Sequence, residues 1–218
     1  MPNRRSKMRK TKDYVSMAML AALSYCLLLI AKFPVVMFLK YEPKDVIIAI
    51  AGFMYGPVAG VIVTAVVCLL ELAISSTGII GMLMNFISTV AFILPAAIIY
   101  KRQKNIKSVV SGFVLGTILM TAVMILANYA ITPLYLNVPR AEVAKLLFPV
   151  FLPFNLFKGF MNSALITILY KPIVSSLATI GMTDYQHRRE KHNTKLSFIT
   201  AGGFLLIAVL ILIFCFII

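Results

Sequence analysis

Residues 45–72 read DVIIAIAGFMYGPVAGVIVTAVVCLLEL, which is two apolar runs joined by Gly56-Pro57, a strong turn signal. The first run has only 12 residues, from Asp45 to Gly56. As a helix it covers about 18 Å, against a bilayer hydrocarbon core of about 30 Å. If the turn lies at one membrane surface, Asp45 lies well below the other, and the preceding loop 34–44 must dip into the protein. Because irregular backbone at that depth must be buried or line a cavity, the stretch predicts a loop folded over a pocket that opens to the outside.

The composition around this stretch excludes a soluble domain. Of the 218 residues, 61% are hydrophobic and 13% are charged, against about 45–50% and about 25% in soluble globular domains. Residues 46–100 contain a single charge, Glu71, and residues 108–139 and 196–218 contain none. Apolar runs of this length predict an all-α, polytopic membrane protein.

The apolar runs and their breaks predict six helices in a core and one more at the C-terminus. The expected helices are 14–33, 46–55, 58–74, 82–100, 109–131, 147–170 and 198–218. The chain then divides into a basic N-terminus (1–13), a six-helix membrane domain (14–175), a charged linker (176–197) and the additional helix (198–218). A short helical turn is possible in the loop 133–146.

The formal net charge of +14 is distributed in a way that predicts orientation. Fifteen of the 21 basic residues lie in the N-terminus, in residues 101–107 and in residues 171–195. Basic residues mark the cytoplasmic side of membrane proteins, so we expect the N-terminus in the cytoplasm of a bacterial cell membrane. These clusters fit anionic lipid, and they carry no motif or aromatic interleaving that would indicate nucleic acid.

Costly polar residues inside the spans indicate a binding site. By helical rise, one group falls in the outer half of the membrane: Glu71, Asn85, Asn128, Asn155, Lys158 and Asn162. Amides and a lysine beside apolar walls suit a neutral, hydrogen-bonding heterocycle or polyol. Alternatively these groups bridge helices, and Glu71 and Lys158 form a structural ion pair.

No motif supports catalysis or a metal centre, so we do not expect an enzyme. Cys26, Cys68 and Cys215 are too scattered for a disulfide framework or a metal site, and His187 and His192 lie in the charged linker. A proton-coupled carrier built around Glu71 is a second class of transporter that the sequence permits.

Several segments resemble the riboflavin-binding S components of energy-coupling factor (ECF) transporters. The resemblance covers about residues 14–175, through FLKYEPKDVIIAIAGFMYGPVAG (38–60), GIIGMLMNFISTVAFILPAAIIYK (78–101), ANYAITPLY (127–135) and PFNLFKG (153–159). It implies a six-helix substrate-binding subunit whose first loop covers a pocket open to the outside. The C-terminal helix 198–218 departs from this pattern.

The resemblance also implies roles for single residues. Asn128, Asn155 and Lys158 would hydrogen-bond the flavin, and Leu39 would pack on its ring system. Two small residues, Ala18 and Ala22, would face a transmembrane coupling subunit that rides on two ABC ATPases.

Glu71, Asn85 and Asn162 are pocket candidates from their depth alone. Riboflavin would be the transported ligand, and no cofactor is expected. Another vitamin or flavin mononucleotide remains an alternative ligand, since Lys40, Lys44, Arg140 and Lys145 in the outer loops could receive a phosphate.

Overall fold

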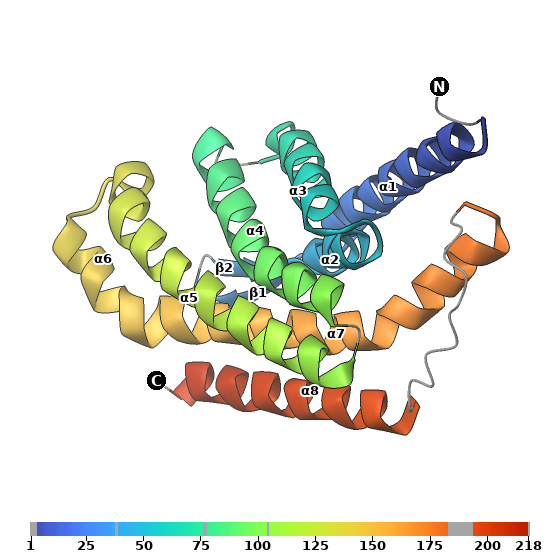
Figure 1. Cartoon of the computed structure of the whole chain (residues 1–218). Helices are drawn as coiled ribbons and strands as arrows, with labels where there is room; N and C mark the ends of the chain where they lie inside the picture. The colour runs from blue at the N-terminus through green and yellow to red at the C-terminus, as the bar shows by residue number, and fades with distance from the viewer. Residues whose placement is uncertain (1–3, 38, 76–77, 104, 183–193, 218) are drawn as a thin grey trace.

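The structure is a computed structural model that describes residues 4–37, 39–75, 78–103, 105–182 and 194–217, and these form a helical bundle with one small hairpin (Figure 1). The elements in chain order are α1 (Arg4–Ile30), β1 (Phe33–Val36), β2 (Leu39–Tyr41), α2 (Lys44–Tyr55), α3 (Pro57–Leu72), α4 (Gly78–Arg102), α5 (Ile106–Leu136), α6 (Arg140–Leu146), the π-helical turn η1 (Leu147–Phe151), α7 (Leu152–Thr179) and α8 (Thr194–Ile217). The expected all-α class is therefore confirmed.

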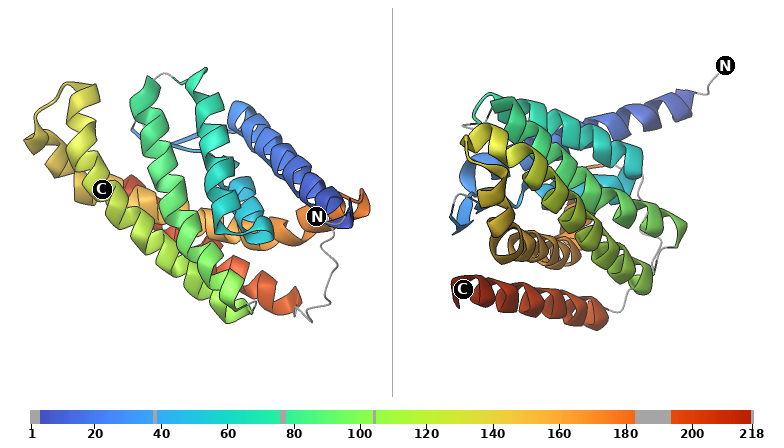
Figure 2. Two further views of the ribbon diagram at one scale, coloured as in Figure 1. Left: turned by 45° about the horizontal axis from the view of Figure 1, so that its top comes forward. Right: turned by 90° about the vertical axis from the view of Figure 1, so that its left-hand side faces the viewer.

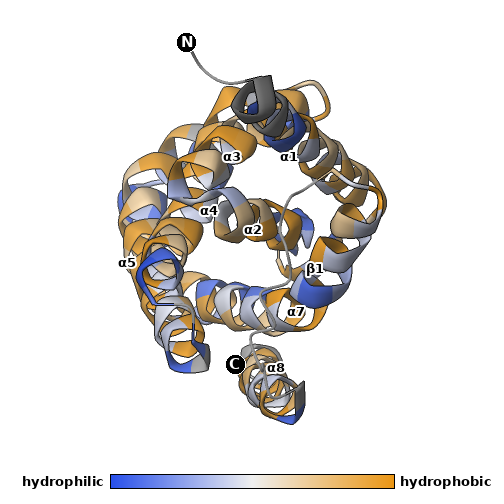
Figure 3. Ribbon diagram, turned by 45° about the vertical axis from the view of Figure 1, so that its right-hand side comes forward, coloured by the Kyte–Doolittle hydropathy of each residue, from blue (hydrophilic) through white to orange (hydrophobic). Residues whose placement is uncertain are grey.

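Helix α2 lies at the centre of the bundle, surrounded by α1, α3, α4, α5 and α7 (Figure 3). Every residue from Lys44 to Gly52 is buried, as expected for the apolar run that begins at Val46; the charged Lys44 and Asp45 are buried with it. The helix has 12 residues, which agrees with the short run seen in the sequence. It starts at Lys44, however, so Lys44 belongs to the buried helix and its assignment to an outer loop is wrong.

The turn between α2 and α3 occurs where the Gly-Pro signal predicted it. Gly56 has φ +99°, a conformation that side chains with a Cβ rarely adopt. Pro57 follows as the first residue of α3, where its missing N–H costs no helical hydrogen bond.

Helices α4 and α5 approach each other closely at two glycines spaced by four residues. A Cβ on Gly112 would lie 3.0 Å from the Cα of Ala96, and a Cβ on Gly116 would overlap the carbonyl oxygen of Phe92. Small residues at this spacing let membrane helices pack at short distance. These glycines therefore fix the α4–α5 contact.

The expected helix 147–170 has a more complex form. Its first turn is the π-turn η1, and α7 continues to Thr179. Pro149 and Pro153 lack backbone donors, which is consistent with a wider turn at this point. Of the described residues, five stretches are long and apolar enough to cross a membrane: 10–30, 78–102, 107–134, 140–179 and 195–214.

The additional C-terminal helix forms and packs along α7, outside the ring of helices (Figures 2 and 3). Its buried residues are Ala201, Phe204 and Ala208. The ring of Phe204 stacks near Phe160 of α7 at a centroid distance of 6.1 Å and meets Phe113 of α5 at 5.9 Å. In the linker, residues 183–193, with His187 and His192, lie outside the described residues.

Candidate functional site

The hairpin of β1 and β2 folds back onto the bundle near the start of α2. Tyr41 is 5% exposed, and its hydroxyl donates to Oδ1 of Asn162 on α7 at 2.8 Å. Its ring meets Phe157 edge-on at a centroid distance of 5.7 Å, while Leu39 on the same strand is half-buried. The end of the hairpin at Tyr41 thus packs against the interior, as the shortness of the following helix predicted, whereas Pro34, Met37 and Lys40 are exposed.

The chemistry of Tyr41 favours this contact. Burial, and to a smaller extent the negative charge of Asp45, raises the pKa of the Tyr41 hydroxyl above its ordinary value. The hydroxyl therefore stays protonated and remains a donor to Asn162.

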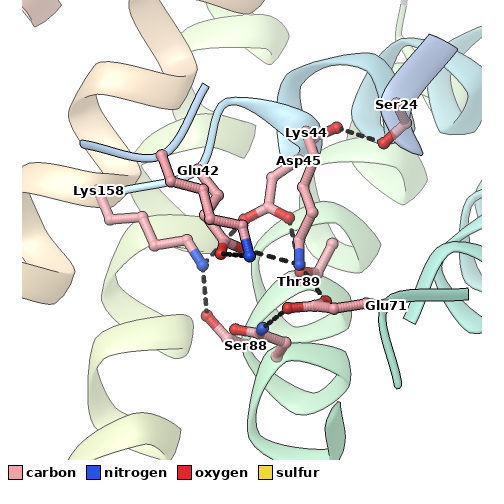
Figure 4. Close-up of polar contacts among 10 residues, drawn as sticks. Ser24, Glu42, Lys44, Asp45, Glu71, Ser88, Thr89 and Lys158 are labelled. Atoms are coloured by element: carbon pink, nitrogen blue, oxygen red, sulfur yellow. Dashed lines mark hydrogen bonds and ion pairs between the residues drawn. The ribbon is translucent and has the colours of Figure 1, made fainter. Parts of the chain in front are cut away.

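Beneath the hairpin, two lysines and three carboxylates form a buried ion network (Figure 4). The fully buried Lys44 lies 2.8 Å from a carboxylate oxygen of Glu42 and pairs with Glu71 of α3. The next residue of α2, Asp45, lies 2.9 Å from Nζ of Lys158 on α7. Two adjacent residues of α2 thus hold opposite charges on two other helices.

Neutral side chains of α4 complete the network. The amide of Asn85 donates to Glu71 at 2.7 Å, and the hydroxyl of Thr89 donates to Asp45 at 2.9 Å. Lys158 also donates to Ser88 at 3.4 Å. Through these ion pairs and hydrogen bonds, the network ties α2, α3, α4 and α7 into one polar unit.

The charges of this unit nearly cancel. Lys44 and Lys158 face Glu42, Asp45 and Glu71, which leaves one negative charge, and Lys32 at the rim lies 3.4 Å from Glu42. A balanced set of this kind avoids the large cost of an isolated buried charge.

The ion pairs differ from the Glu71–Lys158 pair that the sequence permitted. Glu71 pairs with Lys44 and not with Lys158, which pairs with Asp45. Lys44 is enclosed by carboxylates and fully buried, so it is not an outer-loop cation open to a phosphate. Lys40, Arg140 and Lys145 are exposed.

The remaining site candidates are less closely connected. Asn128 and Asn155 are buried on α5 and α7, and each donates to the carbonyl four residues earlier in its own helix, at 2.7 and 2.8 Å. Asn128 also accepts from Thr132 at 2.9 Å. Glu71, Asn85 and Lys158 therefore share one network, which these two asparagines do not join within the described part of the chain.

Asn162 has hydrogen-bonding capacity to spare. Its Oδ1 accepts from Tyr41, but its fully buried Nδ2 has no hydrogen-bond partner among the described residues. A buried donor without a partner is costly, so this amide is suited to a ligand carbonyl or hydroxyl.

Five polar side chains of this region escaped prediction as site residues: Tyr41, Glu42, Asp45, Ser88 and Thr89. Asp45 did carry a signal, because a charge that opens an apolar helix too short to span must lie at depth. Ser88 and Thr89 carried none, since a hydroxyl in an apolar helix commonly bonds to its own backbone.

A cavity of about 470 Å³ lies at the opposite end of α2 and shares no residue with this network. It is lined by aromatic residues that include Phe53, Tyr100 and Tyr170. We assign the polar site to the hairpin end nevertheless, because the spare amide and the lysine gather there. No cluster of three metal-ligating side chains occurs among the described residues.

On α1, Ala18 and Ala22 are exposed, while Leu20, Ala21 and Ser24 face inward. The Ser24 hydroxyl donates to the carbonyl oxygen of Lys44 at 2.9 Å. The alanine face is therefore open to a partner and not used for packing inside the bundle.

The chain is similar to known transport proteins. The family model "ECF transporter, substrate-specific component" matches residues 12–170. The riboflavin transporter RibU of Staphylococcus aureus is 33% identical over 186 residues, which cover 81% of this chain and 98% of the relative. The riboflavin transporter FmnP of Bacillus subtilis is 33% identical over 174 residues, covering 74% and 91%.

A solved structure described as the S component of a bacterial ECF transporter is 32% identical, with a TM-score of 0.66. The similarity covers 77% of this chain and 98% of that one. The relatives are therefore matched over nearly their whole length.

Proposed function

Because the chain belongs to the substrate-specific components of ECF transporters, we propose that it binds riboflavin at the hairpin end of the bundle and delivers it for ATP-driven uptake. As a family member it is a multi-pass membrane transport subunit and not an enzyme. The observation that carries the proposal is that relatives matched over 98% and 91% of their length are named riboflavin transporters.

The polar groups under the hairpin support this ligand. Riboflavin carries ring carbonyls, a ring N–H and a polyol chain, which need both donors and acceptors beside apolar walls. Lys158 has three N–H donors; it forms an ion pair with Asp45 and donates one hydrogen bond, to Ser88, so donor capacity remains for a flavin oxygen. Asn155, one turn away, and Asn128 supply amides, and Leu39 supplies an apolar contact for the ring.

We assign supporting roles to the other candidates. Glu71 and Asn85 bond to each other, and Glu71 also pairs with Lys44, so they hold the site in shape. The spare amide of Asn162 is a further flavin contact. Because Tyr41 packs against Asn162 and Phe157, entry of a flavin requires the hairpin to move, and its return would close the site.

Orientation and partners follow from the same proposal. The cytoplasmic position of the N-terminus is inferred from the basic clusters. The exposed face of Ala18 and Ala22 would contact the transmembrane coupling subunit. That subunit would rest on two ABC ATPases, which drive reorientation of the loaded bundle.

The test is a titration of the purified protein with riboflavin, followed by quenching of flavin fluorescence. Saturable quenching is expected, with competition by riboflavin analogues; folded protein that leaves flavin emission unchanged would refute the proposal. Competition with flavin mononucleotide shows whether the phosphorylated flavin is also a ligand.

A proton-coupled carrier built around Glu71 loses support. The family match assigns the chain to the ECF transporters, a different class from proton-coupled carriers. In addition, Glu71 is engaged by Lys44 and Asn85, which fits a structural role within the network.

A further inference from the structure

The cavity of about 470 Å³ lies at the end of the bundle where α4 turns into α5, away from the hairpin. Its walls come from α2, α4, α5, α7 and α8. Phe53 stands among three other rings, with centroid distances of 5.2 Å to Tyr100, 5.7 Å to Phe113 and 6.3 Å to Tyr170. The volume lies within the range of small-molecule sites, about 300–1,000 Å³, and the lining is mainly apolar.

One wall of this cavity belongs to the helix that the family model does not include. Ser197 and Phe198 of α8 line it, whereas the family match ends at residue 170. Phe198 is 64% exposed, so the cavity reaches the outer surface of the bundle, where lipid chains lie. The additional helix thus completes an apolar space that is open from the bilayer.

The charged residues that the structure describes near the mouth of the cavity are all basic. Lys171 lines it and is exposed, as are Lys101, Arg102 and Lys107 at the neighbouring α4–α5 turn. No acidic residue occurs between residues 72 and 141, so nothing in that stretch offsets these cations. An apolar space with a basic rim between membrane helices matches an anionic phospholipid, because the apolar acyl chain fits the space and the negative headgroup is attracted to the rim.

We infer that the cavity with α8 as one wall is a binding site for one acyl chain of an anionic phospholipid, whose headgroup contacts Lys171. Lysine suits this role, because its apolar stem follows the cavity wall while its ammonium reaches the headgroup region. The inference is independent of the riboflavin proposal, and it places the lipid in the inner leaflet if the N-terminus is cytoplasmic.

The absence of Trp makes a direct experiment possible. In the Phe198→Trp variant, the single indole reports on lipid at the cavity. The variant is placed in phosphatidylcholine vesicles that contain a minor fraction of brominated phosphatidylglycerol or of brominated phosphatidylcholine. We expect brominated phosphatidylglycerol to quench the indole at a mole fraction about fivefold lower than brominated phosphatidylcholine does, which is the effect of one lysine beside an anionic lipid.

Two matched variants make the result specific. Val58→Trp places the indole at the 71% exposed start of α3, at the same end of the bundle but outside the cavity, and should show little lipid preference. Adding Lys171→Gln to Phe198→Trp should abolish the preference at position 198. Equal quenching by the two lipids at position 198, or a preference unchanged by Lys171→Gln, would overturn the inference.

A second measurement covers the case in which Phe198→Trp does not fold. Native mass spectrometry of the unmodified chain should show one retained phosphatidylglycerol. Lys171→Gln should lose it, and Lys145→Gln, which alters an exposed lysine on α6, should keep it. Retention of the lipid by Lys171→Gln, or no retained lipid in the unmodified chain, contradicts the inference.

Discussion

At the residue scale, the fully buried Lys44 has the most demanding environment in the described bundle. It is held between Glu42 and Glu71, and the adjacent Asp45 holds Lys158. Two successive residues of one helix thereby pair with charges from two other helices, α3 and α7. This arrangement positions the Lys158 ammonium under the hairpin, where the proposed ligand would lie.

We predict that Lys44→Met destabilises the protein by about 3–5 kcal/mol, because it leaves buried carboxylates without their partner. Adding Glu71→Gln should recover part of the loss, since it removes one of the unpaired charges. Lys40→Met, at an exposed position of the hairpin, serves as the control. Thermal unfolding in detergent, followed by circular dichroism, gives the midpoints of the single variant, the double variant and the control. A Lys44→Met midpoint equal to that of the control would contradict a structural role for the pair of Lys44 and Glu71.

Lys158→Ala should weaken riboflavin binding about 10- to 100-fold, the effect of losing one charged hydrogen bond. Flavin titration gives the affinity, and Lys145→Ala, at an exposed lysine, is the control. Because Lys158 also pairs with Asp45, the unfolding midpoint has to be measured alongside. Affinity unchanged in folded Lys158→Ala would remove this residue from the proposed site.

At the element scale, short and interrupted elements determine the architecture. Helix α2 is too short to span and is enclosed on all sides, so the chain on its N-terminal side returns inward as a hairpin. Helices α4 and α5 gain their close contact from glycines, and α8 adds a wall beside α7. Element lengths and small residues thus set which surfaces meet.

Gly116→Leu should destabilise the bundle by about 1–3 kcal/mol or more, because the new side chain would overlap the backbone of α4 at Phe92. Gly202→Leu is the matched control, since a Cβ there meets no atom within 4 Å. Thermal unfolding compares the two. Equal midpoints would mean that the α4–α5 contact adapts without cost.

At the scale of the whole molecule, the bundle presents two separate surfaces. The hairpin end carries the polar site, and the face of α1 with Ala18 and Ala22 is exposed and does not touch that site. Binding and coupling should therefore be separable by mutation.

We predict that Ala18→Leu with Ala22→Leu blocks ATP-driven riboflavin uptake in proteoliposomes but leaves flavin affinity unchanged. Bulky side chains would prevent the close helix approach that alanines permit. Ala122→Leu, at an exposed position of α5, should affect neither quantity. Uptake at the normal rate in the double variant would exclude this face as the coupling surface.

Much of the molecule follows from local sequence. The long apolar runs determined that the chain forms membrane helices, because about 20 apolar residues match the bilayer core whatever their neighbours are. Gly56-Pro57 marked a turn that the structure contains, and the shortness of the run before it indicated the inward loop. The C-terminal helix followed from its composition in the same way.

Only the tertiary structure decided which charges meet. The sequence by itself left Glu71 able to pair with Lys158, whereas the folded chain pairs it with Lys44 and gives Lys158 to Asp45. Pairing depends on the rotation and depth of each helix relative to its neighbours, which packing of side chains from distant parts of the chain sets. For the same physical reason, no local pattern revealed the cavity that α8 closes beside α7.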